Sequence, residues 1–467
     1  MASIVFLFLI VSLLSLKDQT AASLSYSCAY RNTSVQFTLL TSAHSASNSA
    51  SSCSLQQCNG TSADNQTCSL SPTPCFDYRT MNNISYCAPG VDCSVLQPCD
   101  NVTHSCASND SVCIVNSCCS PSAVCLPVLT TEFCSRGWRM TGSMNSRRYF
   151  QAGSILVIGK VLVTGGHNGS FALDNAEQYD PSTGSWTTTG SMSFARTSHI
   201  TSILPNGKVL VTAGHASSGL SLDSAELFDP SLGSWTTTGN LNGARFGHTA
   251  SILSNGKVLA TGGRNGGALN TAELYDLSTG NWTTTGNMNN ARYDHTASIL
   301  PDGKVLVTGG YGSGYLNSSE VYDSSTGLWT TTGNMHAVRY QHTASTLFNG
   351  NVLVAGGKDS SGTVLSSVEL YDPSTGVWTT TGNMNNPRLW HTASVLSNGK
   401  VLITGGYNGF NYLNTTELYD SLTGSWTTAG SMNVVRSLHT AFVLSNGKVL
   451  IAGGYDGTNY LNTAELY

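Results

Sequence analysis

The sequence predicts an all-β protein: a seven-bladed β-propeller closed by an N-terminal outer strand and preceded by a small disulfide-rich module. Three observations lead to this fold. A unit of 47 to 49 residues recurs after residue 134, all fourteen cysteines precede it, and the first and last units are incomplete in complementary ways. Abundant glycine and a charged fraction of only 10% also fit a turn-rich β protein.

The expected domains are a signal peptide over residues 1–22, a Cys-rich disulfide module over residues 23–134 and the propeller over residues 135–467. The apolar run from Ile4 to Leu16 is too short to span a bilayer comfortably, and small residues suited to cleavage follow it. A signal anchor is the alternative, because Lys17 follows the run instead of preceding it. We therefore expect a secreted, extracellular protein with no membrane span after signal cleavage.

The cysteines lie between Cys28 and Cys134, and an even number behind an export signal predicts a disulfide framework. A zinc site is the less favoured alternative, built from the closely spaced Cys113, Cys118, Cys119 and Cys125. Asn-x-Ser/Thr sequons predict a glycosylated surface. They occur at Asn32, Asn59, Asn65, Asn83, Asn101, Asn109, Asn168, Asn281, Asn317 and Asn414.

The repeat is marked by tryptophans at Trp138, Trp186, Trp235, Trp282, Trp329, Trp378 and Trp426. Within each unit, runs such as HTASIL and KVLVT are separated by Asn-Gly turns, a pattern that predicts hairpins. A Gly-Gly pair, replaced by Ala213-Gly214 in one unit, then ends the second strand, where the missing β carbons allow neighbouring blades to approach closely. A Tyr-Asp strand and an outer strand with the tryptophan complete the unit.

This order of Gly-Gly, Tyr-Asp and Trp, with a period near fifty, resembles the kelch repeat over about residues 137–467. The resemblance implies that each unit forms one four-stranded propeller blade. Trp138 has no preceding strands, whereas the last unit, His439 to Tyr467, stops before its tryptophan. The segment around Trp138 is therefore expected to supply the outer strand of the last blade, which removes two exposed sheet edges.

An arginine and a glutamate recur in every unit, which predicts Arg–Glu pairs that fix neighbouring strands. The arginines are Arg148, Arg196, Arg245, Arg292, Arg339, Arg388 and Arg436, and the glutamates are Glu177, Glu226, Glu273, Glu320, Glu369, Glu417 and Glu465. The alternative is a cationic ring at the channel mouth. The recurring histidines are interpreted as structural rather than metal-binding. They are His199, His248, His295, His342, His391 and His439, with Gln151 in the seventh place.

Three positions vary within this rigid repeat: the two directly after the arginine and the one directly after Gly-Gly. In an up-and-down blade all three lie in connections on the same face, and they are rich in residues favoured at binding sites. The alternative is loop drift without function. The predicted ligand-binding face comprises Tyr149, Phe246, Arg264, Tyr293, Tyr311, Tyr340, Lys358, Trp390, Tyr407 and Tyr455.

These features predict a binding, adhesion or scaffold protein for an extracellular protein or glycan ligand, not an enzyme. A net charge of −5 without a basic stripe argues against nucleic acid. No catalytic residue, metal ligand or cofactor is predicted, since the sequence has neither a nucleophile elbow nor an H-E-x-x-H motif.

Two relatives of the kelch propeller suggest other functions. Secreted kelch propellers resemble the central domain of galactose oxidase, which implies copper held by Tyr and His and a Cys cross-linked to a Tyr in the propeller. Residues 135–467 contain no cysteine, so a secreted oxidase or other carbohydrate-active enzyme is disfavoured. Intracellular kelch proteins that act as ubiquitin-ligase adaptors generally carry a helical domain before the propeller. This chain carries a Cys-rich segment there instead.

Overall fold

The computed structural model describes residues 137–467 without a gap. Of the preceding segment it describes residues 24–30, 33–39, 43–44, 47–48, 75–79, 85–89, 97–99, 106, 111–115 and 123–127. The chain divides into two compact units, Met1–Gly137 and Trp138–Tyr467. The expected signal peptide lies outside the described residues. Within the ranges given above, no helix has the length and apolar character needed to cross a membrane.

The described part of the first unit consists of short antiparallel strands. β1 pairs with β2, β3 with β4 and β5 with β6, while β9 lies between β7 and β8. Their bounds are β1 Leu24–Tyr30, β2 Thr33–Leu39, β3 Ala43–His44, β4 Ser47–Asn48, β5 Cys75–Arg79, β6 Ser85–Pro89, β7 Gln97–Pro98, β8 Ser111–Ile114 and β9 Val124–Pro127.

Two disulfides lie in this unit, Cys99–Cys113 and Cys106–Cys125, with Cα atoms 5.8 and 5.7 Å apart. They confirm disulfide bonding in the N-terminal region. The zinc alternative is wrong for Cys113 and Cys125, because a disulfide sulfur has no thiolate charge with which to bind the metal. The other two cysteines of that alternative, Cys118 and Cys119, lie outside the described residues.

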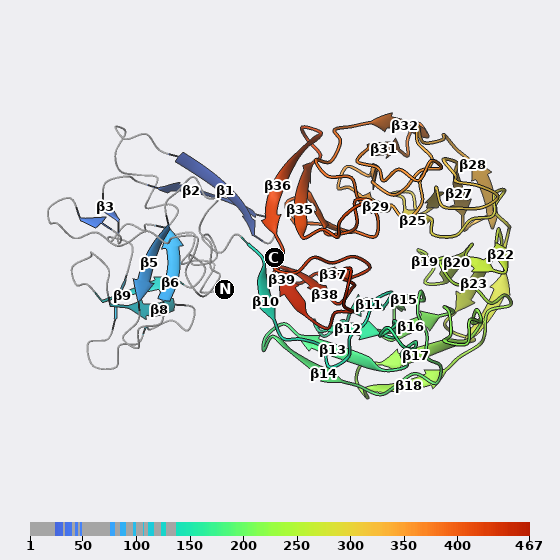
Figure 1. Ribbon diagram of the computed structural model, residues 1–467, viewed down its shortest axis with the longest axis horizontal. Helices are drawn as coiled ribbons and strands as arrows, with labels where there is room; N and C mark the ends of the chain where they lie inside the picture. Colours follow the sequence, from blue (N-terminus) through green and yellow to red (C-terminus); the bar gives the residue numbers. More distant parts are fainter. Residues whose placement is uncertain are drawn as a thin grey trace. The chain divides into compact units, whose positions relative to one another are not determined.

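The second unit is a ring of seven four-stranded antiparallel sheets, which confirms the predicted propeller (Figure 1). In each blade the strands run from the inner strand a to the outer strand d, and each strand a contacts the a strands of both neighbouring blades. The a strands are β11 Ala152–Ile155, β15 Ile200–Ile203, β19 Thr249–Ile252, β25 Thr296–Ile299, β29 Thr343–Thr346, β33 Thr392–Val395 and β37 Thr440–Val443. The b strands are β12 Val161–Thr164, β16 Val209–Thr212, β20 Val258–Thr261, β26 Val305–Thr308, β30 Val352–Ala355, β34 Val401–Thr404 and β38 Val449–Ala452.

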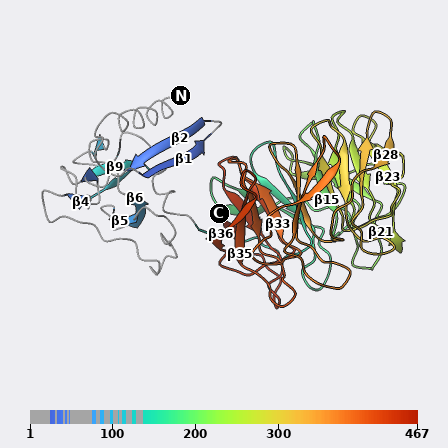
Figure 2. The same cartoon turned by 90° about the horizontal axis from the view of Figure 1, so that it is seen from above.

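Strands c and d complete each blade. The c strands are β13 Ala176–Asp180, β17 Ala225–Asp229, β23 Ala272–Asp276, β27 Ser319–Asp323, β31 Val368–Asp372, β35 Thr415–Asp420 and β39 Ala464–Leu466. The d strands are β14 Ser185–Thr188, β18 Ser234–Thr237, β24 Asn281–Thr284, β28 Leu328–Thr331, β32 Val377–Thr380, β36 Ser425–Ser431 and β10 Arg139–Thr141. An extra hairpin, β21 Arg264–Asn265 and β22 Gly267–Ala268, connects strands b and c of blade 3, and β21 lies at one face of the ring in Figure 2.

The N-terminal strand closes the ring as predicted. β10 pairs with β39, with Arg139 opposite Leu466 and Thr141 opposite Ala464, so blade 7 combines one strand from the start of the propeller with three from its end. The Trp138 ring packs against Tyr467 with centroids 5.2 Å apart. β10 therefore covers the outer edge of β39, as strand d covers strand c in every other blade.

The hydrophobic core lies between the blades. Every residue of the seven b strands is buried, because each VLVT-type strand packs against a neighbouring blade on both faces. Between blades 7 and 1, for example, Val161 and Val163 pack with Phe442 and Leu450. Equivalent clusters follow at the other six junctions. The repeat therefore stabilises the ring through contacts between consecutive blades.

The recurring arginines and glutamates form seven buried ion pairs with N···O distances of 2.6 to 2.8 Å. In blade 1, Glu177 also accepts hydrogen bonds from the backbone N–H groups of Asn145 (2.6 Å) and Ser146 (3.0 Å). Arg148 donates to the carbonyl of Gly165 at 2.8 Å. The pair thus fixes the connection from the preceding blade. The alternative of a cationic ring at the channel mouth is wrong, because all seven arginines are fully buried.

The six histidines connect consecutive blades. The Nε2 atom of His199 lies 2.8 Å from the Thr164 hydroxyl of the preceding blade, and equivalent contacts to threonine recur at the other five. Gln151 occupies the seventh junction, where its amide donates to the Ala452 carbonyl at 2.9 Å. Burial lowers the pKa of every one of these histidines below its ordinary value. They are therefore uncharged structural residues.

Candidate functional site

Two sets of connections meet at one face of the propeller, which we call the loop face: the d–a connections, with the residue after each arginine, and the b–c connections, with the residue after each Gly-Gly. In blade 1, Tyr149 and His167 exchange backbone hydrogen bonds of 3.1 and 2.9 Å. The same pairing occurs in all seven blades. The other pairs are Thr197–His215, Phe246–Arg264, Tyr293–Tyr311, Tyr340–Lys358, Leu389–Tyr407 and Ser437–Tyr455.

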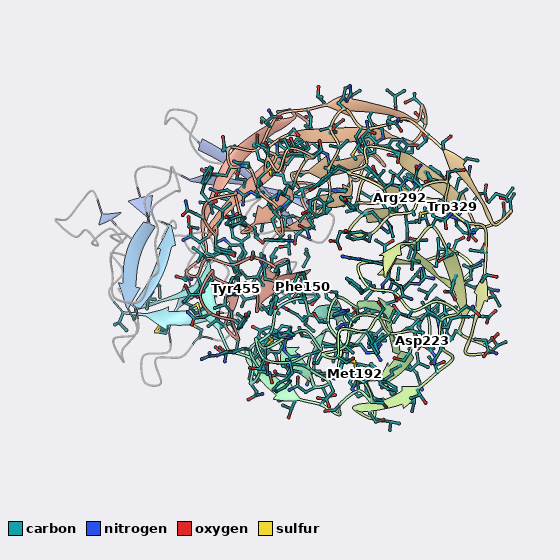
Figure 3. All side chains as sticks on the ribbon, turned by 45° about the vertical axis from the view of Figure 1, so that its right-hand side comes forward. Phe150, Met192, Asp223, Arg292, Trp329 and Tyr455 are labelled. Carbon is teal, nitrogen blue, oxygen red and sulfur yellow. A yellow bond between two sulfur atoms is a disulfide. The ribbon has the colours of Figure 1, made fainter. Side chains whose placement is uncertain are left out.

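The next residue along each d–a connection forms a belt around the ring. The belt comprises Phe150, Ser198, Gly247, Asp294, Gln341, Trp390 and Leu438, all with φ between 50° and 61°. This left-handed conformation is uncommon for residues with a β carbon. Six of the seven N–H groups donate to the carbonyl of the preceding belt residue, at 2.9 to 3.4 Å. The bond from Phe150 to Leu438 closes the belt, and Figure 3 shows Phe150 beside the central opening.

A continuous run of aromatic rings, the tyrosine ridge, crosses the loop face over blades 6, 7 and 1. Consecutive ring centroids lie 4.9 to 6.2 Å apart, and the Tyr460–Tyr149 contact is stacked. In order the ridge contains Trp390, Tyr407, Tyr412, Tyr455, Tyr460 and Tyr149. All six side chains belong to half-buried residues. Four members, from connections of both kinds, were predicted from the sequence, and the structure brings them together.

The b–c loops that carry the ridge are held by their own residues. The Tyr407 hydroxyl donates to the Gly409 carbonyl at 2.7 Å, and Tyr455 makes the equivalent bond at 2.8 Å. Gly457 has a φ of 102°, and a β carbon added there would meet the Tyr412 ring at 2.6 Å. The glycine of this Tyr-x-Gly pattern is therefore required both by the turn and by the ring stacked on it. These contacts fix the tyrosines before any ligand arrives.

A second aromatic cluster lies over blades 3 to 5. Tyr293, Tyr311, Tyr315 and Tyr340 form consecutive contacts with centroids 5.1 to 5.5 Å apart. The guanidinium of Arg264 lies over Tyr293, 5.4 Å from its centroid, in a cation–π contact. Burial raises the pKa of Tyr293 and of Tyr340, so both hydroxyls remain neutral at physiological pH.

The belt residue Asp294 lies next to this second cluster. Gln341, the belt residue of the following blade, donates from Nε2 to the Asp294 carboxylate at 3.1 Å. Burial raises the pKa of the Asp294 carboxyl above its ordinary value, although the Gln341 hydrogen bond and the charge of Arg264 act in the opposite direction. A partly desolvated carboxylate therefore borders the second aromatic cluster.

The ten predicted face residues fall into groups that the sequence does not distinguish. Tyr149, Trp390, Tyr407 and Tyr455 lie in the ridge, and Arg264, Tyr293, Tyr311 and Tyr340 in the second cluster. Lys358 is joined to the latter by its backbone pairing with Tyr340, whereas Phe246 packs on His215 with centroids 4.8 Å apart. Tyr315, Tyr412, Tyr460, Asp294 and Gln341 are absent from the predicted set. A signal for the tyrosines exists, since Tyr-Leu-Asn recurs after each of these b–c loops.

Two family models match the sequence of the propeller. The Kelch motif matches residues 149–193. The Attractin/LZTR1 beta-propeller family matches residues 228–416 and 275–464, which together span just over half of the chain. The chain belongs to the kelch β-propeller family. A search of curated proteins gave no significant match.

Solved structures share the fold of this kelch propeller. One is described as a novel fungal alcohol oxidase with catalytic diversity among the AA5 family, in complex with copper. The match has a TM-score of 0.59 and 18% sequence identity, and it covers 70% of this chain and 75% of the oxidase chain. At this identity the likeness shows a common fold, not a common activity.

Proposed function

We propose that this kelch protein is an extracellular binding or scaffold protein whose loop face receives a protein or glycan ligand. The observation that carries the proposal is the concentration of half-exposed tyrosines in two ordered clusters on one face. Tyr, Trp and Arg dominate the energetics of binding surfaces. Loops rich in Tyr, Ser, Gly and Asn are also the recognition elements of antibodies. The two disulfides support an oxidising compartment outside the cytosol.

The belt and the backbone pairs support the same proposal from the scaffold side. Each loop is tied to its partner loop in the same blade and, through the belt, to the neighbouring blades. A surface fixed in this way loses little conformational freedom when it binds, which increases affinity.

A copper oxidase is the alternative suggested by the structural neighbour, and the residues here do not fit it. The propeller sequence contains no cysteine for a Tyr–Cys cross-link. Its six recurring histidines are buried at blade junctions and bonded to threonines. In the part of the chain that the structure describes, potential metal ligands gather only at Cys99, Cys106 and Cys125, whose sulfurs belong to disulfides. We therefore propose no redox activity.

The combined variant Tyr311→Ala, Tyr407→Ala and Trp390→Ala is expected to abolish ligand binding with little change in melting temperature. Its three side chains belong to the two aromatic clusters and lie outside the cores between blades. Binding is measured by capture from extracellular material and on a glycan array. Phe348→Ala is the control, because Phe348 is 73% exposed in an a–b turn at the opposite end of the strands. Unchanged binding by the triple variant would contradict the proposal.

The proposed secretion can be tested by the glycosylation of three propeller sequons. Asn281 is exposed on strand d of blade 3 and is expected to carry a glycan. Asn317 and Asn414 are expected to be unmodified, because their Nδ2 atoms donate to the carbonyls of Met335 and Met432 at 2.9 and 3.1 Å. Peptide mass spectrometry of protein expressed in a secretory host checks both statements. Loss of the chain from the medium, or an unmodified Asn281, would contradict them.

A further inference from the structure

Unused hydrogen-bonding groups gather in one sector of the loop face, around Asp294. Gln341 supplies the hydrogen bond to the Asp294 carboxylate, and none of the described residues forms an ion pair with it. On the other side lies Gly247 of the preceding blade, where an added β carbon would come within 2.7 Å of Asp294 Oδ1. Glycine at this belt position therefore leaves room for the carboxylate. Asp294 retains spare capacity to accept hydrogen bonds.

The neighbours of Asp294 have spare capacity as well. The Oε1 atom of Gln341 and the Nε1 atom of Trp390, the next belt residue, are both buried without a hydrogen-bond partner. The exposed guanidinium of Arg264 contacts Tyr293, and no described carboxylate pairs with it. Buried polar groups normally have partners, and a ligand bound on this aromatic surface would supply one explanation for the two unpaired atoms. This sector therefore contains both hydrogen-bond acceptors and hydrogen-bond donors.

The backbone of the belt restricts the kind of ligand that fits. One way for an extended peptide to bind is by adding a strand, which requires free N–H and C=O groups in a row. Here six of the seven belt N–H groups bond to the preceding belt residue, and the residues before them are paired across each blade. The belt therefore offers no row of free groups for strand addition, which favours recognition by side chains.

The charges of the sector also restrict it. Arg264 is opposed by Asp294, which lies close enough for their charges to interact. Lys358 of the b–c connection in blade 5 is succeeded by Asp359, so the sector carries as many acidic as basic residues. A polyanion would meet the Asp294 carboxylate, and a cation would meet Arg264. A hydroxyl group both donates and accepts, so it can bond to Asp294 or Gln341 and also accept from Arg264. The adjoining tyrosine faces suit an apolar C–H surface.

A pyranose ring combines these properties, since hydroxyls surround a ring whose C–H bonds form an apolar face. We propose that Asp294, Gln341 and Arg264, together with Tyr293, Tyr311 and Tyr340, bind a pyranose unit of an uncharged glycan. This inference rests on the proposed binding function of the loop face and names its ligand class. The carboxylate and amide bond to ring hydroxyls, and the tyrosines pack on the ring.

The test uses the full-length protein and immobilised oligosaccharides, half of them uncharged and half carrying sialic or uronic acids. We expect binding to uncharged members. Asp294→Asn keeps the side-chain shape and the tolerance for positive φ. The substitution should weaken binding of the best-bound glycan at least about tenfold, as measured by calorimetry. This is the effect expected for loss of a hydrogen bond to a charged group. The control Phe348→Ala, in the a–b turn at the opposite end of the strands, should bind like the unmodified protein.

Three results would overturn the inference. Unchanged affinity of Asp294→Asn for a glycan that the triple aromatic variant no longer binds would place the sugar on another part of the face. Preference for anionic glycans would overturn the charge argument. Binding of a purified protein ligand, lost in the triple variant, without any glycan binding would refute the ligand class but leave the proposed function intact.

Discussion

Replacing Arg388 by alanine is expected to lower the free energy of unfolding of the propeller by about 3–5 kcal/mol, because it leaves a buried carboxylate without its cation. Arg388 donates to Glu417 at 2.6 Å and to the Gly405 carbonyl at 2.8 Å, and both charged side chains are fully buried. Glu417 Oε2 also accepts a hydrogen bond of 2.7 Å from the backbone N–H of Asn385. Denaturant unfolding of the full-length protein measures the change.

The same blade provides the control for this prediction. Lys400 and Asp420 form an ion pair of 3.1 Å at the surface, where the lysine side chain is 39% exposed. Surface pairs are typically worth about 0–1 kcal/mol, so Lys400→Ala should have a much smaller effect. An equal decrease in the free energy of unfolding in the two variants would mean that the buried arginines do not fix the blade junctions.

Acid is expected to destabilise the propeller before its surface aspartates titrate. Burial lowers the pKa of His248 and of His391 to about 3, so the folded protein excludes protons that the unfolded chain binds near pH 6.5. The contribution to stability is therefore complete above about pH 6.5 and is lost as the pH falls toward 3. At pH 5 the loss is about 2 kcal/mol for each histidine, against a total stability of roughly 5–15 kcal/mol for a domain.

The seventh junction supplies the matching variant. Gln151 replaces histidine there and donates to Ala452 without titrating. Substituting all six histidines by glutamine should flatten the fall in melting temperature between pH 7 and pH 5, whatever its effect at pH 7. Surface aspartates such as Asp180, whose pKa is lowered to about 2 by hydrogen bonds from Ser182 and by Lys160, titrate only at lower pH. An unchanged pH dependence in the six-fold variant would contradict the assignment to histidine.

The features that could be predicted from the sequence are those that every blade repeats. The Arg148–Glu177 type of pair occurs seven times, and residues that recur at the same place in every repeat are expected to meet the same neighbours in each blade. Closure by the segment after Trp138 followed from counting strands in the first and last units. The antiparallel hairpins followed from alternating runs and Asn-Gly turns.

The contacts on the loop face could not be obtained in the same way, because they differ from blade to blade. Tyr412 meets Tyr455 of the next blade only through the curvature of the ring, which spacing along the chain does not contain. The position of Asp294 over Gly247 depends on a positive φ that no residue type at that site requires. Neither contact leaves a periodic signal.

The pairing of β10 with β39 has a consequence for biosynthesis. Residues 139–141 leave the ribosome more than three hundred residues before their partners at 464–466. Until then, the nascent chain carries one strand without a sheet and a growing stack of blades with an open end. Both features expose surfaces that can associate with other chains. Factors that shield nascent chains would therefore be needed for nearly the whole translation of the propeller, and a ribosome that stops within the seventh blade would release a product unable to close.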